Sequence, residues 1–197
     1  MIFRRTDLEF RSGKKIVLLG RNGSGKSTFF KCLLGELTLN EGEVFRSPDV
    51  KITFFDQHAS FDEEKTATQV VGEMLNITDT DAKAALGAMK FDSDRMKIPC
   101  KNLSGGERMR IRFALAFYPK PDLLILDEPT NHIDEITWEI LLDACKSFKN
   151  SILLVTHDHE FIEEFSPDFF WKVENNSVVE RHKNLDELLE EMKEQTN

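Results

Sequence analysis

Residues 20–27 read Gly-Arg-Asn-Gly-Ser-Gly-Lys-Ser, which are the residue types and the spacing of a phosphate-binding loop. The segment follows a short apolar run, Lys15 to Leu19, which we expect to be a strand, and it precedes a helical pattern over 27–34. Glycines let the backbone N–H groups turn inward, and a helix N-terminus adds a partial positive charge. A purely structural glycine-rich turn is the weaker interpretation, because the full motif arises by chance in roughly 1 in 150 chains of this length.

The loop predicts a nucleotide phosphate as its ligand, with a role for each kind of side chain. Lys26 would place a compact positive charge at the β- and γ-phosphate oxygens, and the Ser27 hydroxyl would ligate Mg²⁺. The residues predicted to contact the nucleotide are Gly20, Arg21, Asn22, Gly23, Ser24, Gly25, Lys26, Ser27 and Thr28.

A second motif joins an apolar strand, Leu123 to Leu126, to two carboxylates, Asp127 and Glu128. An aspartate at the end of a buried strand beside a phosphate loop is placed to hold Mg²⁺ or its waters, so we predict that role for Asp127. Glu128 reaches past the metal and could polarise an attacking water. The alternative, a simple turn at Asp-Glu-Pro, is disfavoured by the phosphate loop upstream.

Composition limits the class of protein. A net charge of -9 disfavours a broad nucleic-acid-binding face, although a local basic patch around Arg108, Arg110 and Arg112 stays open. The apolar runs are far shorter than a membrane span, and the N-terminus does not resemble a secretory signal. Three widely spaced cysteines predict reduced thiols and the cytosol; they are Cys32, Cys100 and Cys145.

The order of apolar patterns predicts strands alternating with helices, hence a mostly parallel sheet. We expect strands at 15–19, 43–46, 51–55, 123–126, 152–155, 169–173 and 178–181. We expect helices at 27–34, twice within 66–90, and at 105–117, 135–148, 159–164 and 185–194. Asp79 or Thr80 is the expected cap of the helix over 82–89, and turns at 47–49 and 175–176 would join two strand pairs.

Four further segments resemble conserved motifs of the ATP-binding cassette (ABC) family, in the order that this family uses. Residues 103–107, Leu-Ser-Gly-Gly-Glu, resemble its signature motif, and Gln57 resembles its Q-loop glutamine. Residues 131–134 resemble its D-loop, and His157 resembles its switch histidine. A lone glutamine or histidine would more often be structural, but six ordered segments between Gly20 and Asp158 are not a coincidence.

The resemblance implies a fold and a reaction. The fold would be an α/β P-loop NTPase of ABC type: a mostly parallel sheet core, a small antiparallel part, and a helical subdomain at about 66–118 that carries the signature, within one domain over 1–197. An acidic helix at about 185–195 would end it. The reaction would be Mg²⁺-dependent ATP hydrolysis, with Glu128, His157, Gln57 and Lys26 as catalytic residues and Ser27, Gln57 and Asp127 at the metal.

A second anion site is superfluous within one domain, because Lys26 already belongs to a phosphate cradle. Ser104, Gly105 and Gly106 begin a helix and would form such a site. The resemblance to the family implies a head-to-tail dimer in which these three residues contact the partner's ATP. The partner would be a second cassette, either a copy of this chain or another protein.

Several details resemble the ABC-F branch, whose members act on ribosomes and carry no membrane domain. They are the segments 55–58, 128–134 and 156–162, and the short gap between Gln57 and Leu103. The sequence departs from the branch pattern in that it has one cassette where members of the branch have two joined by a helical linker. We expect the acidic helix to be a surface cap of the domain rather than the start of such a linker. The adenine-stacking aromatic residue that cassettes place about 25 residues before the phosphate loop is also missing. Phe3 and Phe10 are expected in the core, and Glu107 and His159 stand where the branch often has glutamine and arginine.

Three functions therefore stay open at this stage. The first is an ABC-F-like translation factor or ribosome-associated ATPase in the cytoplasm. The second is the ATPase subunit of a transporter, which would meet the membrane only through a permease docked near Gln57. The third is a non-catalytic module whose ATP-driven closure regulates assembly.

Overall fold

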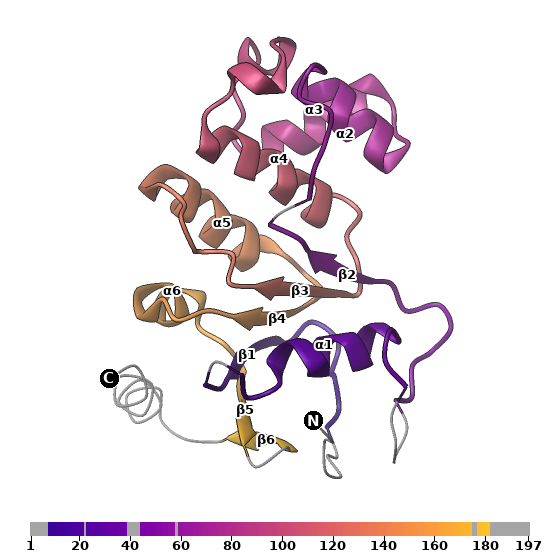
Figure 1. Cartoon of the computed structure of the whole chain (residues 1–197), viewed down its shortest axis with the longest axis vertical. Helices are drawn as coiled ribbons and strands as arrows, with labels where there is room; N and C mark the ends of the chain where they lie inside the picture. The colour runs from indigo at the N-terminus through magenta and orange to yellow at the C-terminus, as the bar shows by residue number, and fades with distance from the viewer. Residues whose placement is uncertain (1–7, 22, 39–43, 58, 175–176, 182–197) are drawn as a thin grey trace.

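A six-stranded sheet organises the chain, with strand order β2-β3-β4-β1-β5-β6 (Figure 1). The structure is a computed structural model and describes residues 8–21, 23–38, 44–57, 59–174 and 177–181. The strands are β1 Lys15–Leu19, β2 Ile52–Phe55, β3 Leu123–Asp127, β4 Ser151–Val155, β5 Phe169–Glu174 and β6 Ser177–Arg181. The α-helices are α1 Lys26–Leu34, α2 Ala67–Leu75, α3 Asp79–Ala88, α4 Gly105–Phe117, α5 Glu135–Ser147 and α6 His159–Phe165. Two short 3-10 helices, η1 Arg95–Lys97 and η2 Cys100–Asn102, precede α4.

The sheet is parallel from β2 to β5, and β6 pairs antiparallel with β5. Alternate strand residues point to opposite faces, which divides the core in two. Val17, Leu124 and Leu154 pack with α4, α5 and α6, whereas Ile125 and Leu153 pack with α1. Because neighbouring parallel strands share one carboxyl edge, the segments that follow β1, β2, β3 and β4 meet there.

Helices α2, α3 and α4 form a separate layer at the top of Figure 1, joined to the sheet through β2 and β3. Small and apolar side chains hold this layer together, among them Ala82, Leu86 and Ile111, each fully buried. Thr66 and Ser104 begin α2 and α4 with complete capping boxes, in which the N-cap hydroxyl and the side chain three residues later satisfy each other's backbone N–H groups. The layer therefore presents the start of α4 in a fixed conformation.

The predicted fold class is confirmed, and so is the closing hairpin of β5 and β6. The strand predicted at 43–46 is wrong for the described residues 44–46, which are irregular. Phe45 is 85% exposed, so this stretch buries too little apolar surface to hold a place in the sheet. The cap of α3 is also corrected: Thr78, not Asp79 or Thr80, accepts from the N–H of Asp81.

Three expectations about the fold concern residues outside the described ones, namely the acidic helix at about 185–195, the turn at 175–176 and Phe3. Phe10, in contrast, is described, and its ring meets the edge of Trp171 at 4.5 Å between centroids, as part of the core on the α1 face. None of the described helices is long and apolar enough to cross a bilayer. Cys100 and Cys145 are buried free thiols, and Cys32 is a partly buried one.

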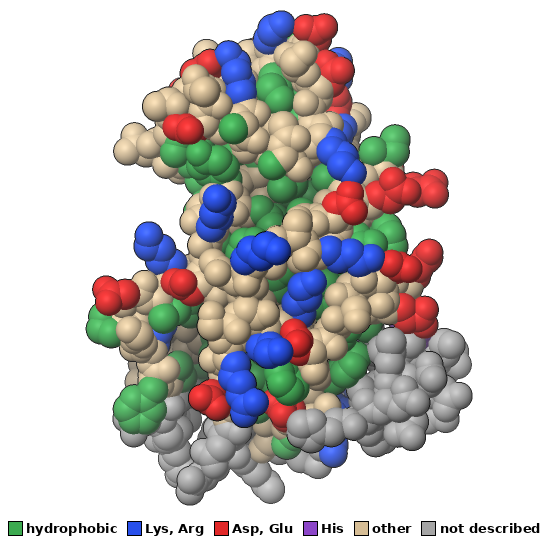
Figure 2. All heavy atoms as spheres, turned by 180° about the vertical axis from the view of Figure 1, so that it is seen from behind, with side chains coloured by type: hydrophobic (Ala, Val, Ile, Leu, Met, Phe, Trp, Pro, Cys, Tyr) green, Lys and Arg blue, Asp and Glu red, His purple; other side chains and the backbone are tan. Residues whose placement is uncertain are grey.

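Positive and negative side chains are interspersed on the face in Figure 2, with Lys and Arg across its middle. Two arginines of the basic segment in α4 are used within the fold. Arg110 donates to the carbonyl of Lys90 and stacks on Phe91, and Arg112 donates to the carbonyl of Ala59. These contacts hold the helical layer together.

Candidate functional site

Four neighbouring parallel strands each deliver a predicted site residue to the same edge of the sheet. Gly20 follows β1, Gln57 follows β2, Asp127 ends β3, and His157 follows β4. The spatial order β2-β3-β4-β1 places these segments side by side, although they lie far apart in sequence. This edge is where parallel α/β sheets bind ligands.

The loop between β1 and α1 has the backbone that the motif requires. Gly25 caps α1 in a left-handed conformation with φ 111°, which residues with a Cβ rarely adopt. The Nζ atom of Lys26 donates to the carbonyl of Gly20 at 2.6 Å, so the ammonium lies over the start of the loop. Burial lowers the pKa of Lys26, and Glu128 and Asp127 oppose that shift.

The two carboxylates at the end of β3 lie in a desolvated setting. Burial raises the pKa of both Asp127 and Glu128, while the charge of Lys26 acts in the opposite direction on each. A partly buried cation beside two partly buried carboxylates is a charge cluster of the kind that concentrates at functional sites.

Glu128 is held in an unusual conformation. Its φ is 50°, in the left-handed region, and its N–H donates to the carbonyl of Val155 at 2.8 Å. One carboxylate oxygen, Oε1, lies 3.3 Å from Nε2 of His157, and the other, Oε2, is buried without a hydrogen-bond partner. Strain and an unsatisfied buried oxygen on one residue indicate a functional position, because neither favours folding.

A polar network behind His157 fixes the segment that follows β4. The hydroxyls of Thr130 and Thr156 lie 2.6 Å apart, and Thr156 accepts from the N–H of Asp158 at 3.1 Å. Asp158 caps α6, and its other oxygen accepts from the indole N–H of Trp138 at 2.7 Å. Helix α5 thus supports the turn that carries His157.

The start of α4 packs closely against the start of α5. A Cβ on Gly106 would overlap the carboxylate of Asp134 and lie 2.8 Å from the hydroxyl of Thr137, so only glycine fits there. Asp134 is itself the N-cap of α5 and accepts from the N–H of Thr137. The segments that resemble the signature and the D-loop are therefore in direct contact.

A family model described as ABC transporter matches residues 3–131. The chain belongs to the ATP-binding cassette (ABC) family. As an ABC ATPase domain it has the sheet, the phosphate loop and the helical layer in the order described above.

Curated relatives of this cassette include the ATP-binding protein Uup of Escherichia coli, which is 35% identical over 86% of this chain and 28% of its own length. The probable ATP-binding protein YheS of Haemophilus influenzae is 32% identical over 98% of the chain and 31% of its own length. Mouse ATP-binding cassette sub-family F member 3 is 32% identical over 98% of the chain and 28% of its own length. The cassette is thus most like the F branch, and it spans about a third or less of these relatives.

A solved structure of the ATP-binding cassette MJ0796, described as a dimeric post-hydrolysis state bound to ADP and Pi, matches with a TM-score of 0.72. It covers 91% of this chain and 89% of that chain, at 21% identity. At this identity the likeness shows a shared fold, which agrees with the sheet order and the helical layer found in this cassette.

The predicted site residues of this cassette divide into two groups. Gly20, Arg21, Gly23, Gly25, Lys26, Asp127, Glu128 and His157 gather at the sheet edge with the exposed Ser27 and the partly buried Ser24, Thr28 and Gln57. Ser104, Gly105 and Gly106 lie apart from them, at the start of α4 in the helical layer. Asn22 falls outside the described residues.

Sequence reasoning missed three supporting residues of the cassette. Trp138, Thr130 and Arg95 each hold a predicted site segment by hydrogen bonds. A spacing signal existed only for Glu107, the partner of Arg95: Ser-x-x-Glu before an apolar run is the pattern of a capping box. The other pairings join residues 12 to 26 positions apart and carry no local signature.

The donor set of the cassette fits Mg²⁺ held together with nucleotide phosphates. Among the residues that the structure describes, no group of three or more His, Cys, Asp or Glu could hold a metal. Mg²⁺ commonly uses one or two protein oxygens, several waters and the phosphates of its nucleotide. Burial removes solvent from the Asp127 carboxylate and raises its pKa. A divalent cation beside it would stabilise the charged form.

Proposed function

We propose that this cassette binds Mg-ATP at the carboxyl edge of β1, β3 and β4, pairs head to tail with a second cassette, and hydrolyses the nucleotide. The observation that carries the proposal is Glu128: one oxygen lies beside His157, the other is buried without a partner, and the backbone is left-handed. A carboxylate held in this way, next to a phosphate loop, is suited to accept a proton from water.

The nucleotide phosphates would lie on the backbone N–H groups of residues 20–28, at the N-terminus of α1. Lys26 would contact the β- and γ-phosphate oxygens once it leaves the carbonyl of Gly20. Ser27, Asp127 and Gln57 are the residues that would hold Mg²⁺, which supplies charge neutralisation to the phosphates.

The chemical step would be an in-line displacement at the γ-phosphorus. A water oxygen forms a bond to phosphorus, the bond to the bridging oxygen of ADP breaks, and the water proton passes to Glu128. The raised pKa of Glu128 makes it a stronger base than an exposed carboxylate. His157, 3.3 Å from Glu128, would orient that carboxylate and contact the γ-phosphate.

The second half of the site would come from the partner. Ser104 is an exposed N-cap, and the N–H groups of the first turn of α4 follow it. These groups suit an anion, and the phosphate loop of the same chain lies elsewhere in the fold. The partner would be a copy of this chain or another cassette, and closure of the pair on two ATP molecules would be the mechanical output.

Steady phosphate release by the purified protein tests this reaction. Glu128→Gln should lower release about 100- to 1000-fold while leaving ATP binding intact, and it should trap an ATP-bound dimer. Glu163→Gln, at an exposed position of α6, is the matched control. Equal turnover by Glu128→Gln and the parent chain would remove Glu128 from the mechanism, and no release by the parent chain would leave only a binding module.

The physiological role that we propose is that of an ABC-F-like, ribosome-associated factor in the cytoplasm. Relatives named as ATP-binding proteins and as a sub-family F member support this role. Glu128→Gln protein should sediment with ribosomes from its native lysate in ATP, and less so in ADP. Recovery of a permease instead would assign the cassette to a transporter, and the ribosomal role would be wrong.

A further inference from the structure

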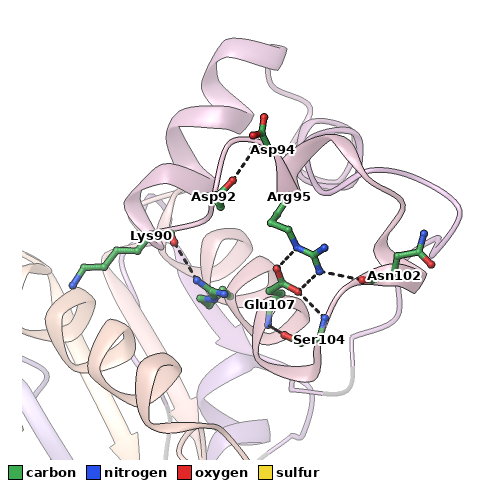
Figure 3. A network of polar contacts seen from close by, with 8 residues as sticks. Lys90, Asp92, Asp94, Arg95, Asn102, Ser104 and Glu107 are labelled. Carbon is green, nitrogen blue, oxygen red and sulfur yellow. Dashed lines mark hydrogen bonds and ion pairs between the residues drawn. The ribbon is translucent and has the colours of Figure 1, made fainter.

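Arg95 reaches from η1 to the first turn of α4, the segment that we assign to the partner's nucleotide (Figure 3). Its Nε atom donates to Oε1 of Glu107 at 2.6 Å, and one terminal nitrogen donates to Oε2 at 2.8 Å. That same terminal nitrogen donates to the carbonyl of Asn102 at 3.1 Å, just before the signature. The guanidinium therefore connects the first turn of α4 to the end of η2, which precedes it in the chain.

Glu107 already has a local role. Its Oε2 accepts from the N–H of Ser104 at 2.7 Å, and its own N–H donates to the hydroxyl of Ser104, which completes the capping box. Either glutamate or glutamine can make these two bonds, since only an accepting oxygen is needed. The negative charge of Glu107 is thus unnecessary for the cap.

That charge is nevertheless present at every physiological pH. The hydrogen bonds from Arg95, together with that from Ser104, hold the pKa of Glu107 at about 2. The carboxylate is only 11% exposed, so water screens it poorly. An uncompensated negative charge in the first turn of α4 would repel an anion at the helix N-terminus, because Coulomb repulsion over such short separations is strong where solvent is excluded.

We propose that Arg95 is a positioning residue of the signature half-site, which neutralises Glu107 and thereby lets the start of α4 accept the γ-phosphate of the partner's ATP. The inference rests on the proposed function, and it adds a residue that does not itself touch nucleotide. A merely structural contact would affect only the stability of the helical layer. A compensating charge affects the association of two ATP-bound cassettes.

The experiment measures ATP-driven dimerisation by sedimentation velocity in the hydrolysis-blocked Glu128→Gln chain. Arg95→Met should weaken that association about tenfold or more, because a neighbouring negative charge is left unbalanced. Glu107→Gln alone should change it by less than about threefold, since the cap survives. Arg95→Met with Glu107→Gln should return it to within about threefold of the parent, because the charge and its compensator are removed together.

Lys97→Met is the matched control, because Lys97 lies in the same 3-10 turn and pairs with the exposed Asp94 rather than with Glu107. It should leave dimerisation unchanged. ATP affinity of the monomer should stay constant in all variants, since its phosphate loop lies at the sheet edge. The Arg95→Met defect should also shrink as salt rises from about 0.05 to 0.5 M, because screening weakens charge repulsion.

Two results would overturn the inference. One is an Arg95→Met chain that dimerises as tightly as its parent. The other is a double variant that dimerises as weakly as Arg95→Met does, which would assign Arg95 to packing alone. Thermal unfolding of each variant shows whether the helical layer itself has lost stability. A Glu128→Gln parent that never dimerises in ATP would instead contradict the head-to-tail pairing of the proposed function.

Discussion

The sheet edge and the start of α4 are both assigned to phosphate groups, yet they are built in opposite ways. At the edge, burial raises the pKa of Asp127 and Glu128 and lowers that of Lys26, and buried oxygens of Glu128 and Ser24 lack partners. At the start of α4, Ser104, Glu107 and Arg95 satisfy one another.

The difference indicates two ways of preparing a site. The edge holds charge and strain that a bound Mg-nucleotide would relieve, so binding should stabilise it. The signature turn is already organised by its own hydrogen bonds, so docking against a partner costs it little ordering. One half would respond to its ligand, whereas the other would act as a fixed template.

The largest predicted effect tests the responsive half. Glu128→Gln should lower ATP turnover about 100- to 1000-fold, because the carboxylate that takes up the water proton is lost. It should also stabilise the nucleotide-free chain, since a strained, desolvated acid is replaced by a neutral group. Phosphate release and chemical unfolding measure the two effects. A variant with reduced stability would show that Glu128 is not under electrostatic strain.

The next effect tests the fixed template. Gly106→Ala should cost about 1–3 kcal/mol of unfolding free energy, because the new Cβ overlaps Asp134 and Thr137. ATP-driven dimerisation should fall with it. Gly105→Ala is the matched control for the stability measurement, as a Cβ there meets nothing within 4 Å in the chain. Equal stability of the two variants would mean that α4 and α5 are free to separate.

A pH titration examines the same template more finely. The pKa of Glu107 in the folded chain is about 2, below its ordinary value of 4.5, so the ionised group stabilises the fold above pH 4.5 and loses that contribution as pH falls toward 2. The contribution is about 1–3 kcal/mol after allowance for the partial exposure of Arg95.

Unfolding free energies at pH 7 and pH 3 would measure it. The parent chain should lose more stability over that interval than Glu107→Gln does, while Glu63→Gln, at an exposed position, should behave as the parent does. The same loss in the parent and in Glu107→Gln would show that the ion pair adds nothing to the fold.

The smallest effect concerns the support of the switch segment. Trp138→Phe removes the hydrogen bond to Asp158 while keeping the ring that meets Phe161. We expect a loss of about 1 kcal/mol in stability, the size of one hydrogen bond, and a several-fold fall in kcat at unchanged KM. An unchanged kcat would mean that His157 is positioned without help from α5.

Sequence patterns were most informative where one strand and one motif coincide. β1, β3 and β4 are short apolar runs that end directly in Gly20, Asp127 and the His157 segment, so their edge could be predicted from order alone. Parallel sheets place such ends together, which is a consequence of topology rather than of any single residue.

The remainder depended on contacts that sequence does not encode locally. Residues 44–46 carry a strand-like composition, but pairing, not propensity, decides whether a strand forms. The N-cap of α3 is Thr78, one residue before Asp79, and a difference of one residue is within the usual uncertainty of helix ends. Arg95 meets Glu107 across a connection with two 3-10 turns, so no periodic spacing predicts the pair.

The close approach of Gly106 to Asp134 has an evolutionary consequence. A larger residue in place of Gly106 requires a shorter side chain in place of Asp134. The hydroxyl of Thr137 limits the space for a larger residue at position 106 as well. Descendants of this chain should therefore exchange these residues only in concert, and a lineage that loses the glycine should show a compensating change at the cap of α5.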